Sequence, residues 1–405
     1  MAKQPEHSWI TGIGLVSSLG EGAHEHWQKL SADAGPRPVI DPQRFAPYAV
    51  HPLAPIDFSK QIPRTTDQRQ MERWQRIGVY AAGLALADAK LSGDMELLDR
   101  TDLCVAAANG ERDLVLDAHV LTTVRASPSP GAALNHELTT GLRPTLYLGQ
   151  LSNLLAANIS IVHKVTRSSR TFKGEEMAGV SAIENAVERI EGGESELVLV
   201  GGALNAERED LLLGCELADG LYGGPFRSVW ERRDCDGGAV LGSIGAFLLV
   251  EAASHAQARG VRPYARIGTV RSEHTRRGGG HAAATMARLF AGLGLDALEN
   301  KLPVLSGASG VEPATAEEQT FIGELTKEGF EPVVRAWGSV LGHSLEAHFL
   351  VGMALAAMSV SAGRFYPPFE GSGYELPGDA HPDRILVTAF SHWRGEGLGL
   401  VVPVQ

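Results

Sequence analysis

The segment that spans Arg170 to Gly202 combines features that place one polar side chain at the start of a helix. Its residues predict a strand, a glycine-containing turn, an amphipathic helix and a second, buried strand. Small residues at Gly174, Ala178 and Gly179 permit a tight turn with Glu176 at its tip. This is the layout of a nucleophile elbow, in which helix N–H groups stabilise negative charge. Because a carboxylate is a poor acyl acceptor, the segment is also typical of an ordinary helix with an acid in its first turn.

Short apolar runs rich in β-branched or small residues alternate with longer helical patterns along the whole chain. The runs that predict strands are 9–16, 103–108, 196–201 and 238–250, then 262–270, 302–306, 331–337, 385–390 and 397–404. The patterns that predict helices are 69–91, 178–190, 282–293, 316–327 and 345–360. Buried strands that alternate with helices indicate a layered α/β fold with helices on both sheet faces. The succession occurs twice, which predicts two duplicated halves, residues 1–252 and 253–405.

Composition restricts the class of function. The chain has 405 residues and a formal net charge of -12, which argues against attraction of the whole surface to nucleic acid or anionic lipid. Its three cysteines have no Cys-x-x-Cys spacing, which favours a reducing cytoplasm. The uncharged runs fall short of the ~20 strongly apolar residues that a membrane span needs. The histidines never fall at metal-ligand spacing and Gly12-Ile13-Gly14 lacks the rest of a dinucleotide fingerprint, so no metal and no cofactor is predicted.

Five segments, in one order and nearly from end to end, resemble the β-ketoacyl-acyl carrier protein synthases. They are Ile10–Leu30 (ITGIGLVSSLGEGAHEHWQKL), Arg64–Leu91, the nucleophile segment NISIVHKVTRSSRTFKGEEMAG, Pro225–Gly260 and Ser339–Val360 (SVLGHSLEAHFLVGMALAAMSV). Five segments at the family's spacing are a specific match. The resemblance implies a thiolase-like, five-layer αβαβα fold, with an acyl carrier protein and its phosphopantetheine arm as a partner.

The same register shows where the chain departs from the family. The family's cysteine nucleophile is replaced by Glu176, and its first catalytic histidine is replaced by Ser306. The family's lysine falls on Gly338, whereas the second histidine is kept as His343. The glycine-rich gate near the C-terminus has become Phe390-Ser391-His392-Trp393-Arg394, which adds bulk where a flexible gate is expected.

These replacements have a chemical consequence. Decarboxylative condensation needs a thiolate that carries the acyl chain and two neutral imidazoles that stabilise the enolate and the oxyanion. Glu176 cannot form a stable thioester. The resemblance therefore favours a non-catalytic, chain-length-factor-type subunit that forms a heterodimer with an active ketosynthase in fatty-acid or polyketide elongation. The alternative is an acyltransferase or decarboxylase that uses Glu176 as a general base, or Ser306 with His343.

A group of arginines lies near the start of the first long helical pattern. Its members are Arg64, Arg69, Arg73 and Arg76. In one continuous helix the last three would share a face, because their spacing is i, i+4, i+7. In the family this region docks the acidic carrier protein, so the resemblance implies electrostatic steering of that partner. The alternative is a solvated face in which Asp67 and Glu72 pair with the arginines.

Overall fold

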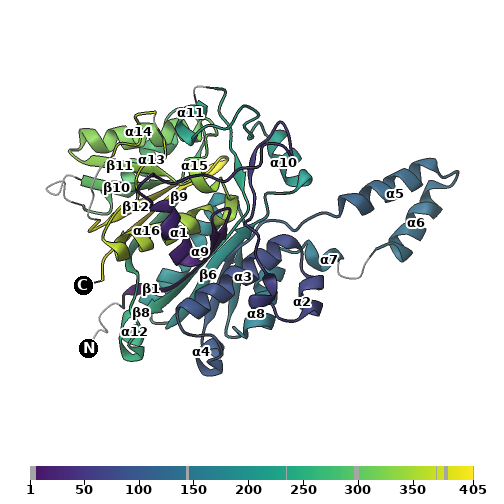
Figure 1. Cartoon of the computed structure of the whole chain (residues 1–405), viewed down its shortest axis with the longest axis horizontal. Helices are drawn as coiled ribbons and strands as arrows, with labels where there is room; N and C mark the ends of the chain where they lie inside the picture. Colours follow the sequence, from purple (N-terminus) through teal and green to yellow (C-terminus); the bar gives the residue numbers. More distant parts are fainter. Residues whose placement is uncertain are drawn as a thin grey trace.

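The computed structural model describes residues 6–142, 146–233, 235–295, 301–370, 372–377 and 382–404, and Figure 1 shows their arrangement. Hydrogen bonds join the long strands in the order β11-β10-β12-β13-β9-β1-β8-β6-β4-β5. The first set along the chain is β1 (Ser8–Ser17), β4 (Asp102–Ala106), β5 (Ser169–Phe172), β6 (Leu197–Leu204) and β8 (Ile244–Ala252). The second set is β9 (Ala265–Arg276), β10 (Lys301–Ser306), β11 (Glu331–Ala336), β12 (Ile385–Phe390) and β13 (Arg394–Val402). The short strands are β2 (Gly20–Glu21), β3 (Val50–His51) and β7 (Leu241–Gly242).

The two sets of strands repeat one topology. In each set the first strand pairs antiparallel with the fifth, and the fifth pairs antiparallel with the fourth. The fourth then pairs parallel with the second, and the second parallel with the third. The sets meet where β1 pairs antiparallel with β9, with Ser8 opposite Ile267 and Ile10 opposite Ala265. The fold therefore consists of two duplicated halves, while the boundary at residue 252 stays a prediction.

Helices form the layers between and outside the two sets of strands. The central helices α9 (Glu176–Glu191) and α16 (His348–Ala362) contact each other, and α9 contacts β4 and β6 on one side and β9 and β13 on the other. The outer helices are α3 (Arg73–Asp88) and α8 (Leu154–His163) on the first set, and α13 (His281–Ala291) and α14 (Ala314–Lys327) on the second. The predicted five-layer αβαβα architecture is confirmed, with hydrophobic clusters in the centre and beneath each outer layer.

Ten further α-helices lie in the part of the chain that the structure describes. They are α1 (Gly22–Leu30), α2 (Thr65–Gln70), α4 (Met95–Asp99), α5 (Leu114–Ala126), α6 (Pro130–Thr140), α7 (Leu146–Gly149), α10 (Glu209–Glu216), α11 (Val229–Arg233), α12 (Ala253–Arg259) and α15 (Gly338–Leu341). The helix predicted over residues 69–91 is divided, because α2 ends before Met71 and α3 begins at Arg73. Glu72 forms a capping box at the start of α3, a local signal that interrupts the apolar period. The prediction of one continuous helix is therefore wrong.

Two glycines in β1 allow α3 to approach the sheet closely. A Cβ on Gly14 would lie 1.9 Å from the carbonyl oxygen of Ala81, and one on Gly12 would lie 2.4 Å from that of Ala85. Any side chain at either position would push the helix off the strand. Close packing of helix on strand therefore accounts for the Gly12-Ile13-Gly14 sequence.

The helix α16 owes its apolar composition to its place in the central layer. By length and composition alone, the stretch Leu345–Ala362 could cross a membrane, with a mean hydropathy of 1.5. However, 83% of this stretch is buried inside the protein, where α16 contacts β8, β9, β12 and β13. Burial in the core accounts for the same composition.

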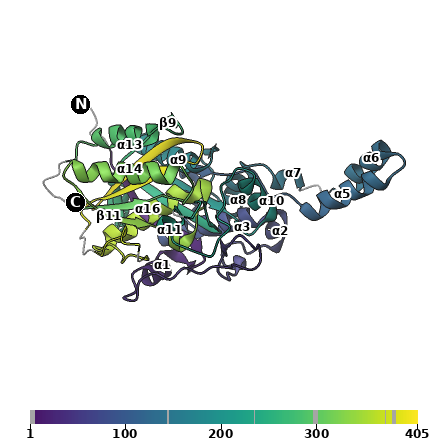
Figure 2. The same cartoon turned by 90° about the horizontal axis from the view of Figure 1, so that it is seen from above.

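The helices α5 and α6 form an arm that projects from the layered body. The two helices pack on each other, and Figures 1 and 2 show them extending away from the rest of the chain. Neither helix contains a buried residue. Leu121 is 57% exposed and Leu138 is 46% exposed. Apolar side chains of both helices of the arm are therefore open to solvent.

Candidate functional site

The turn before α9 places Glu176 as the first residue of that helix, with its side chain only 2% exposed. The turn contains Gly174, at φ 131°, and Glu175, at φ 55° and ψ -138°. A non-glycine residue in such a sparsely populated region costs roughly 1–3 kcal/mol, and the strain persists only where the surrounding structure enforces it. The turn therefore holds Glu176 at the tip of an elbow, facing the protein interior.

Two imidazoles contact the Glu176 carboxylate. His343 Nε2 lies 2.8 Å from Glu176 Oε1, and His392 Nδ1 lies 3.3 Å from the same oxygen. Burial opposes ionisation of Glu176, but His392 and the hydrogen bond with His343 outweigh it and hold the pKa of this carboxyl well below its usual range. Burial lowers the pKa of His392 to about 4, so its ring is neutral at pH 7. The site therefore presents a buried carboxylate beside a neutral imidazole.

A further histidine and a tryptophan lie behind His343. The centroid of the His348 ring is 4.2 Å from that of His343, and Trp337 Nε1 donates a 3.2 Å hydrogen bond to His348 Nδ1. Burial lowers the pKa of His348 well below its ordinary value, so this ring is also neutral. No motif marks His348 in the sequence, although it lies in the same family-like segment as His343. The cluster therefore holds more imidazoles than the family register predicts.

Ser306 has other partners than the Glu176 cluster. Its Oγ donates a 2.7 Å hydrogen bond to Glu318 Oε1, and Thr388 Oγ1 donates to the same oxygen. Burial raises the pKa of Glu318 to about 7. The alternative reactive pair of Ser306 with His343 is therefore not assembled. The imidazole that accompanies His343 at Glu176 comes instead from His392, in the loop after β12.

Gly338, where the family register places a lysine, begins α15 beside the histidine cluster. A Cβ at Gly338 would lie 3.1 Å from the carbonyl oxygen of Ala308 and 3.8 Å from Cε1 of His348. The first of these distances is tighter than ordinary van der Waals contact. A longer side chain would therefore require its neighbours to shift, and the position contributes no charge to the site.

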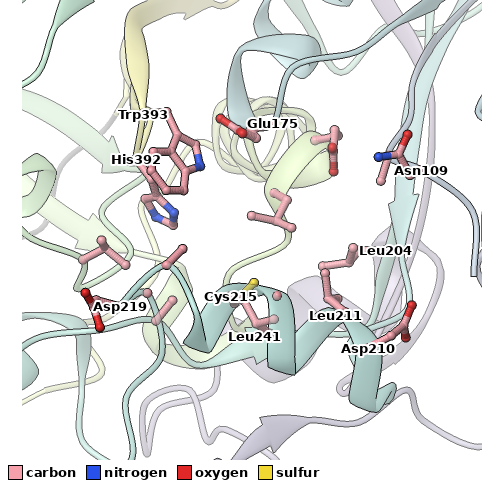
Figure 3. Close-up of a pocket in the computed structure, with 18 of the residues that line it drawn as sticks. Asn109, Glu175, Leu204, Asp210, Leu211, Cys215, Asp219, Leu241, His392 and Trp393 are labelled. Atoms are coloured by element: carbon pink, nitrogen blue, oxygen red, sulfur yellow. The ribbon is translucent and has the colours of Figure 1, made fainter.

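The residues predicted as a gate have different positions. Phe390 is buried at the end of β12, and His392 turns inward to Glu176. Trp393 is 55% exposed, and Figure 3 shows it next to His392 on one side of the cavity. Arg394 is exposed at the start of β13. Of these residues His392 and Trp393 line the cavity, and His392 also contacts Glu176.

A cavity of about 610 Å³ adjoins the cluster, a volume typical of small-molecule sites. Figure 3 shows Glu175 and His392 on one side of it and Cys215 on the other. Burial, reinforced by the nearby charge of Glu176, raises the pKa of Glu175 to about 6 and that of Glu346 to about 7. Burial also raises the pKa of Cys215 to about 11. The cavity therefore has an acidic wall and a thiol that is protonated at neutral pH.

The first two of the predicted docking arginines lie at the surface. Arg64 precedes α2, and its Nε is 2.9 Å from Asp67 Oδ2 in an exposed ion pair. Arg69 lies in the last turn of α2 and is exposed. Both side chains are open to a partner, although the pairing with Asp67 reduces the free positive charge of Arg64.

The other two docking arginines are partly buried on α3. Arg73 Nη2 is 3.0 Å from Glu207 Oε2, and the guanidinium of Arg76 lies over the Phe58 ring at 5.5 Å. Because α2 and α3 are separate helices, the predicted common face of Arg69, Arg73 and Arg76 does not exist. Arg73 and Arg76 serve packing within the chain rather than an exposed basic stripe.

Glu176, His343 and His392 also form a group of potential metal ligands. Their ligand atoms all lie within 4.8 Å of one another. The sequence-based exclusion of a metal site depends on spacing along the chain, and such spacing cannot detect residues that three distant segments bring together. The structure brings one carboxylate and two imidazoles together here, a donor set that can bind a transition metal.

The duplicated five-layer fold, with an elbow at the start of a central helix, defines a thiolase-fold protein. Residues 9–256 match the model of the family described as beta-ketoacyl synthase, N-terminal domain. The chain therefore belongs to the β-ketoacyl synthase family. The match covers the elbow and the first duplicated half.

Individual relatives agree with this assignment. The chain is 24% identical over 379 residues to the oxytetracycline polyketide beta-ketoacyl synthase 1 of Streptomyces rimosus. This alignment covers 88% of this chain and 85% of the relative. It is 25% identical over 280 residues to the 3-oxoacyl-[acyl-carrier-protein] synthase 2 of Rhizobium meliloti, covering 64% of this chain and 62% of that relative.

Solved structures share the fold at low identity. The ishigamide ketosynthase/chain length factor superposes with a TM-score of 0.79 and 20% identity, covering 99% of this chain and 100% of that chain. A type II polyketide ketosynthase in complex with its acyl-carrier protein gives a TM-score of 0.76 and 16% identity, with 99% and 100% covered. At these identities the superpositions establish the fold alone.

Proposed function

We propose that the chain is a non-catalytic, chain-length-factor-type subunit that forms a heterodimer with an active ketosynthase during elongation of a fatty-acid or polyketide chain. The observation that carries the proposal is the buried carboxylate of Glu176 at the elbow, where the family register expects cysteine. A carboxylate cannot hold the growing chain as a stable thioester. The relatives support a place in polyketide assembly, since one of them is described as an oxytetracycline polyketide synthase.

The cysteines of the chain do not replace the missing nucleophile. Burial raises the pKa of Cys104 to about 12 and that of Cys215 to about 11, so both are thiols and not thiolates at neutral pH. Cys235 packs against a separate small cluster of Tyr222 and Val240. All three are free, which supports a reducing, cytoplasmic location. Covalent acyl transfer therefore lacks a suitable thiol.

Two surface features support a partner subunit. Within the described residues β5 pairs with β4 alone and forms one edge of the sheet, where an incoming strand could pair. The exposed apolar residues of the arm and of the segment after it lie on the same part of the chain. They are Leu121, Leu134, Leu138, Tyr147, Leu148 and Leu151. An open strand edge and an apolar arm together suit a large subunit interface.

A carrier protein is the second proposed partner. Arg64 and Arg69 are the exposed arginines of the predicted docking group and would meet its acidic surface. The cavity next to Glu175 and His392 has a volume that suits a phosphopantetheine arm or part of an acyl chain. One fold relative was solved with an acyl-carrier protein bound, which supports this contact.

Co-expression tests the pairing. A tagged copy of the chain is produced together with an untagged ketosynthase that is encoded beside it and keeps the catalytic cysteine and two histidines. The mass of the captured complex is then measured by native mass spectrometry. A ketosynthase of an unrelated pathway is the control. We expect a one-to-one heterodimer with the neighbouring ketosynthase alone. A homodimer that never exchanges with that ketosynthase would contradict the proposal.

A second candidate function is a decarboxylase or an acyltransferase with a non-cysteine site. The observation that favours it is the hydrogen bond of Glu176 with His343 beside a cavity, since an ionised carboxylate can act as a general base. The purified chain is incubated with malonyl-carrier protein, and loss of carbon dioxide is followed by mass. Activity that disappears in Glu176→Ala and persists in Glu318→Gln would favour this candidate over the first.

A further inference from the structure

We propose that Glu176, His343 and His392 form a binding site for one divalent transition-metal ion, of which Zn²⁺ is the reference case. The side chains come from the start of α9, the segment after α15 and the loop between β12 and β13. They supply one carboxylate and two imidazoles, a donor set found in zinc and non-haem iron proteins. This inference is independent of whether the chain pairs with a ketosynthase.

The distances between the donor atoms suit a small metal ion. Ligands bound to Zn²⁺ at about 2.1 Å in a tetrahedral site lie about 3.4 Å from one another. His392 Nδ1 is 3.3 Å from Glu176 Oε1, and His343 Nε2 is 2.8 Å from the same oxygen. All three atoms lie within 4.8 Å of one another. Side-chain rotations that move the donor atoms by about 1 Å would bring all three to the spacing of a tetrahedral site.

A second observation is that one oxygen of the Glu176 carboxylate is buried without a partner. Glu176 Oε2 makes no hydrogen bond in the described part of the chain, although the side chain is almost fully buried. Leaving a buried carboxylate oxygen without a partner is unfavourable. A bound cation would compensate the carboxylate as a whole, which a hydrogen bond from one histidine does only in part.

The ring of His392 is oriented as metal-binding histidines usually are. Its Nε2 lies 2.7 Å from Ser309 Oγ, which in turn accepts a 3.1 Å hydrogen bond from the backbone N–H of Val311. A fixed partner at one ring nitrogen holds the other toward the metal, and loss of such a partner typically weakens binding about 10–100-fold. Ser309 therefore positions His392 so that Nδ1 faces Glu176.

The surroundings of the cluster decide which cation would bind and how it would enter. His392 and Glu175 line the cavity, so an ion has a path from solvent, and a fourth ligand position is open on that side. Two imidazoles favour Zn²⁺, Co²⁺, Ni²⁺, Cu²⁺ or Fe²⁺ over Mg²⁺ and Ca²⁺, which prefer oxygen ligands. The positive end of the α9 dipole disfavours a cation, and the carboxylate of Glu176, the first residue of that helix, opposes this effect.

Metal binding by the purified full chain tests the inference. The protein is stripped with chelator, dialysed against Zn²⁺ and analysed for metal content, and Co²⁺ is used as a spectroscopic probe. We expect one equivalent of Zn²⁺ per chain and a Co²⁺ spectrum without a thiolate charge-transfer band. No bound Zn²⁺ above the dialysis buffer, or a thiolate band that assigns the metal to cysteine, would overturn the inference.

Variants locate the site. Ser309→Ala should weaken Zn²⁺ binding about 10–100-fold, and His392→Ala and Glu176→Gln, which each remove a ligand, should weaken it more. The matched control is His119→Ala, because His119 Nε2 lies 3.3 Å from Glu137 Oε2 in another histidine–carboxylate pair, on the arm. Its variant should bind as the wild type does. Equal Zn²⁺ binding by the wild type, His392→Ala and Glu176→Gln would contradict the assignment. If a variant fails to fold, the Co²⁺ spectrum of the wild type decides whether the metal has thiolate ligands.

Discussion

The Oε1 atom of Glu176 and the Nε2 atom of His343, 167 residues apart in the chain, lie 2.8 Å from each other in the centre of the molecule. This contact joins the first duplicated half to the second at the elbow of α9. In this contact the imidazole of His343 is bound to a permanent carboxylate. The family register places an acyl group there only transiently, on the cysteine nucleophile. The relationship explains why a chain with the complete fold of a condensing enzyme is proposed to act as its companion.

A cysteine at position 176 tests whether this position is the elbow. In Glu176→Cys the thiol would begin α9 beside His343 and His392, where the helix N-terminus and hydrogen bonding favour the thiolate. We expect iodoacetamide to alkylate it at least ~10-fold faster than Cys104 or Cys215 at pH 7, as read by peptide mass spectrometry. The wild-type chain is the control. A rate no higher than that of Cys215 would show that the position lacks the elbow environment.

A double-mutant cycle measures the coupling of Glu176 with His343. His343→Ala removes one partner of a buried carboxylate and should lower the free energy of unfolding in urea by about 3 kcal/mol. In a Glu176→Gln background the same change should cost less than half as much, because the amide is neutral. His26→Ala, at a buried histidine outside the cluster, should cost the same in both backgrounds. Additive costs for His343→Ala would refute the coupling.

Glu318 should make the stability of the protein depend on pH. Burial raises the pKa of its carboxyl from 4.5 to about 7, so the folded chain keeps a proton that the unfolded chain releases between these values. The contribution of Glu318 is therefore present below pH 4.5 and is lost as the pH rises to 7. The amide in Glu318→Gln cannot ionise. Between pH 5 and pH 8 the free energy of unfolding of the wild type should therefore fall by ~1–3 kcal/mol more than that of Glu318→Gln.

Urea titrations at the two pH values make this comparison. Glu328→Gln, at the exposed end of α14, is the control and should keep the pH dependence of the wild type. An unchanged pH dependence in Glu318→Gln would mean that the buried carboxyl at Ser306 is not protonated in the folded chain.

The arm should serve association and not folding. Leu121→Glu and Leu138→Glu each place a charge on an exposed side chain of α5 or α6, and should change the free energy of unfolding of the isolated chain by less than ~0.5 kcal/mol. The same variants should lose capture of the neighbouring ketosynthase in co-expression. Met95→Glu, at an equally exposed apolar residue of α4, should leave capture intact. Undiminished capture by both arm variants would place the interface elsewhere.

The fold is readily predicted from local patterns, with two exceptions. Buried strands such as Leu197–Leu204 and amphipathic helices such as α9 carry their periodicity in adjacent residues, so the layered architecture and its duplication follow from the sequence. The division between α2 and α3 does not, because the Glu72 capping box competes with an apolar period that continues through it. The projecting arm also escapes prediction, since its helices have no buried face.

The site is predicted in part. The position of Glu176 follows from the glycine turn, and His343 follows from the family register. The place of His392 beside Glu176 does not follow, because the register assigns it to a gate and the contact depends on how the loop after β12 folds back. The sequence also does not show whether Ser306 lies beside His343. In the structure Ser306 forms a hydrogen bond with Glu318 instead.

A condensation assay on the isolated chain and on its complex shows directly whether the chain catalyses condensation itself. Each is incubated with acyl-carrier and malonyl-carrier substrates, and both the products and the mass of each polypeptide are recorded. We expect the isolated chain to gain no acyl mass and to form no β-ketoacyl product, whereas the complex with its ketosynthase forms product with the acyl group on the partner. Product from the isolated chain, or an acyl adduct on it, would contradict the account.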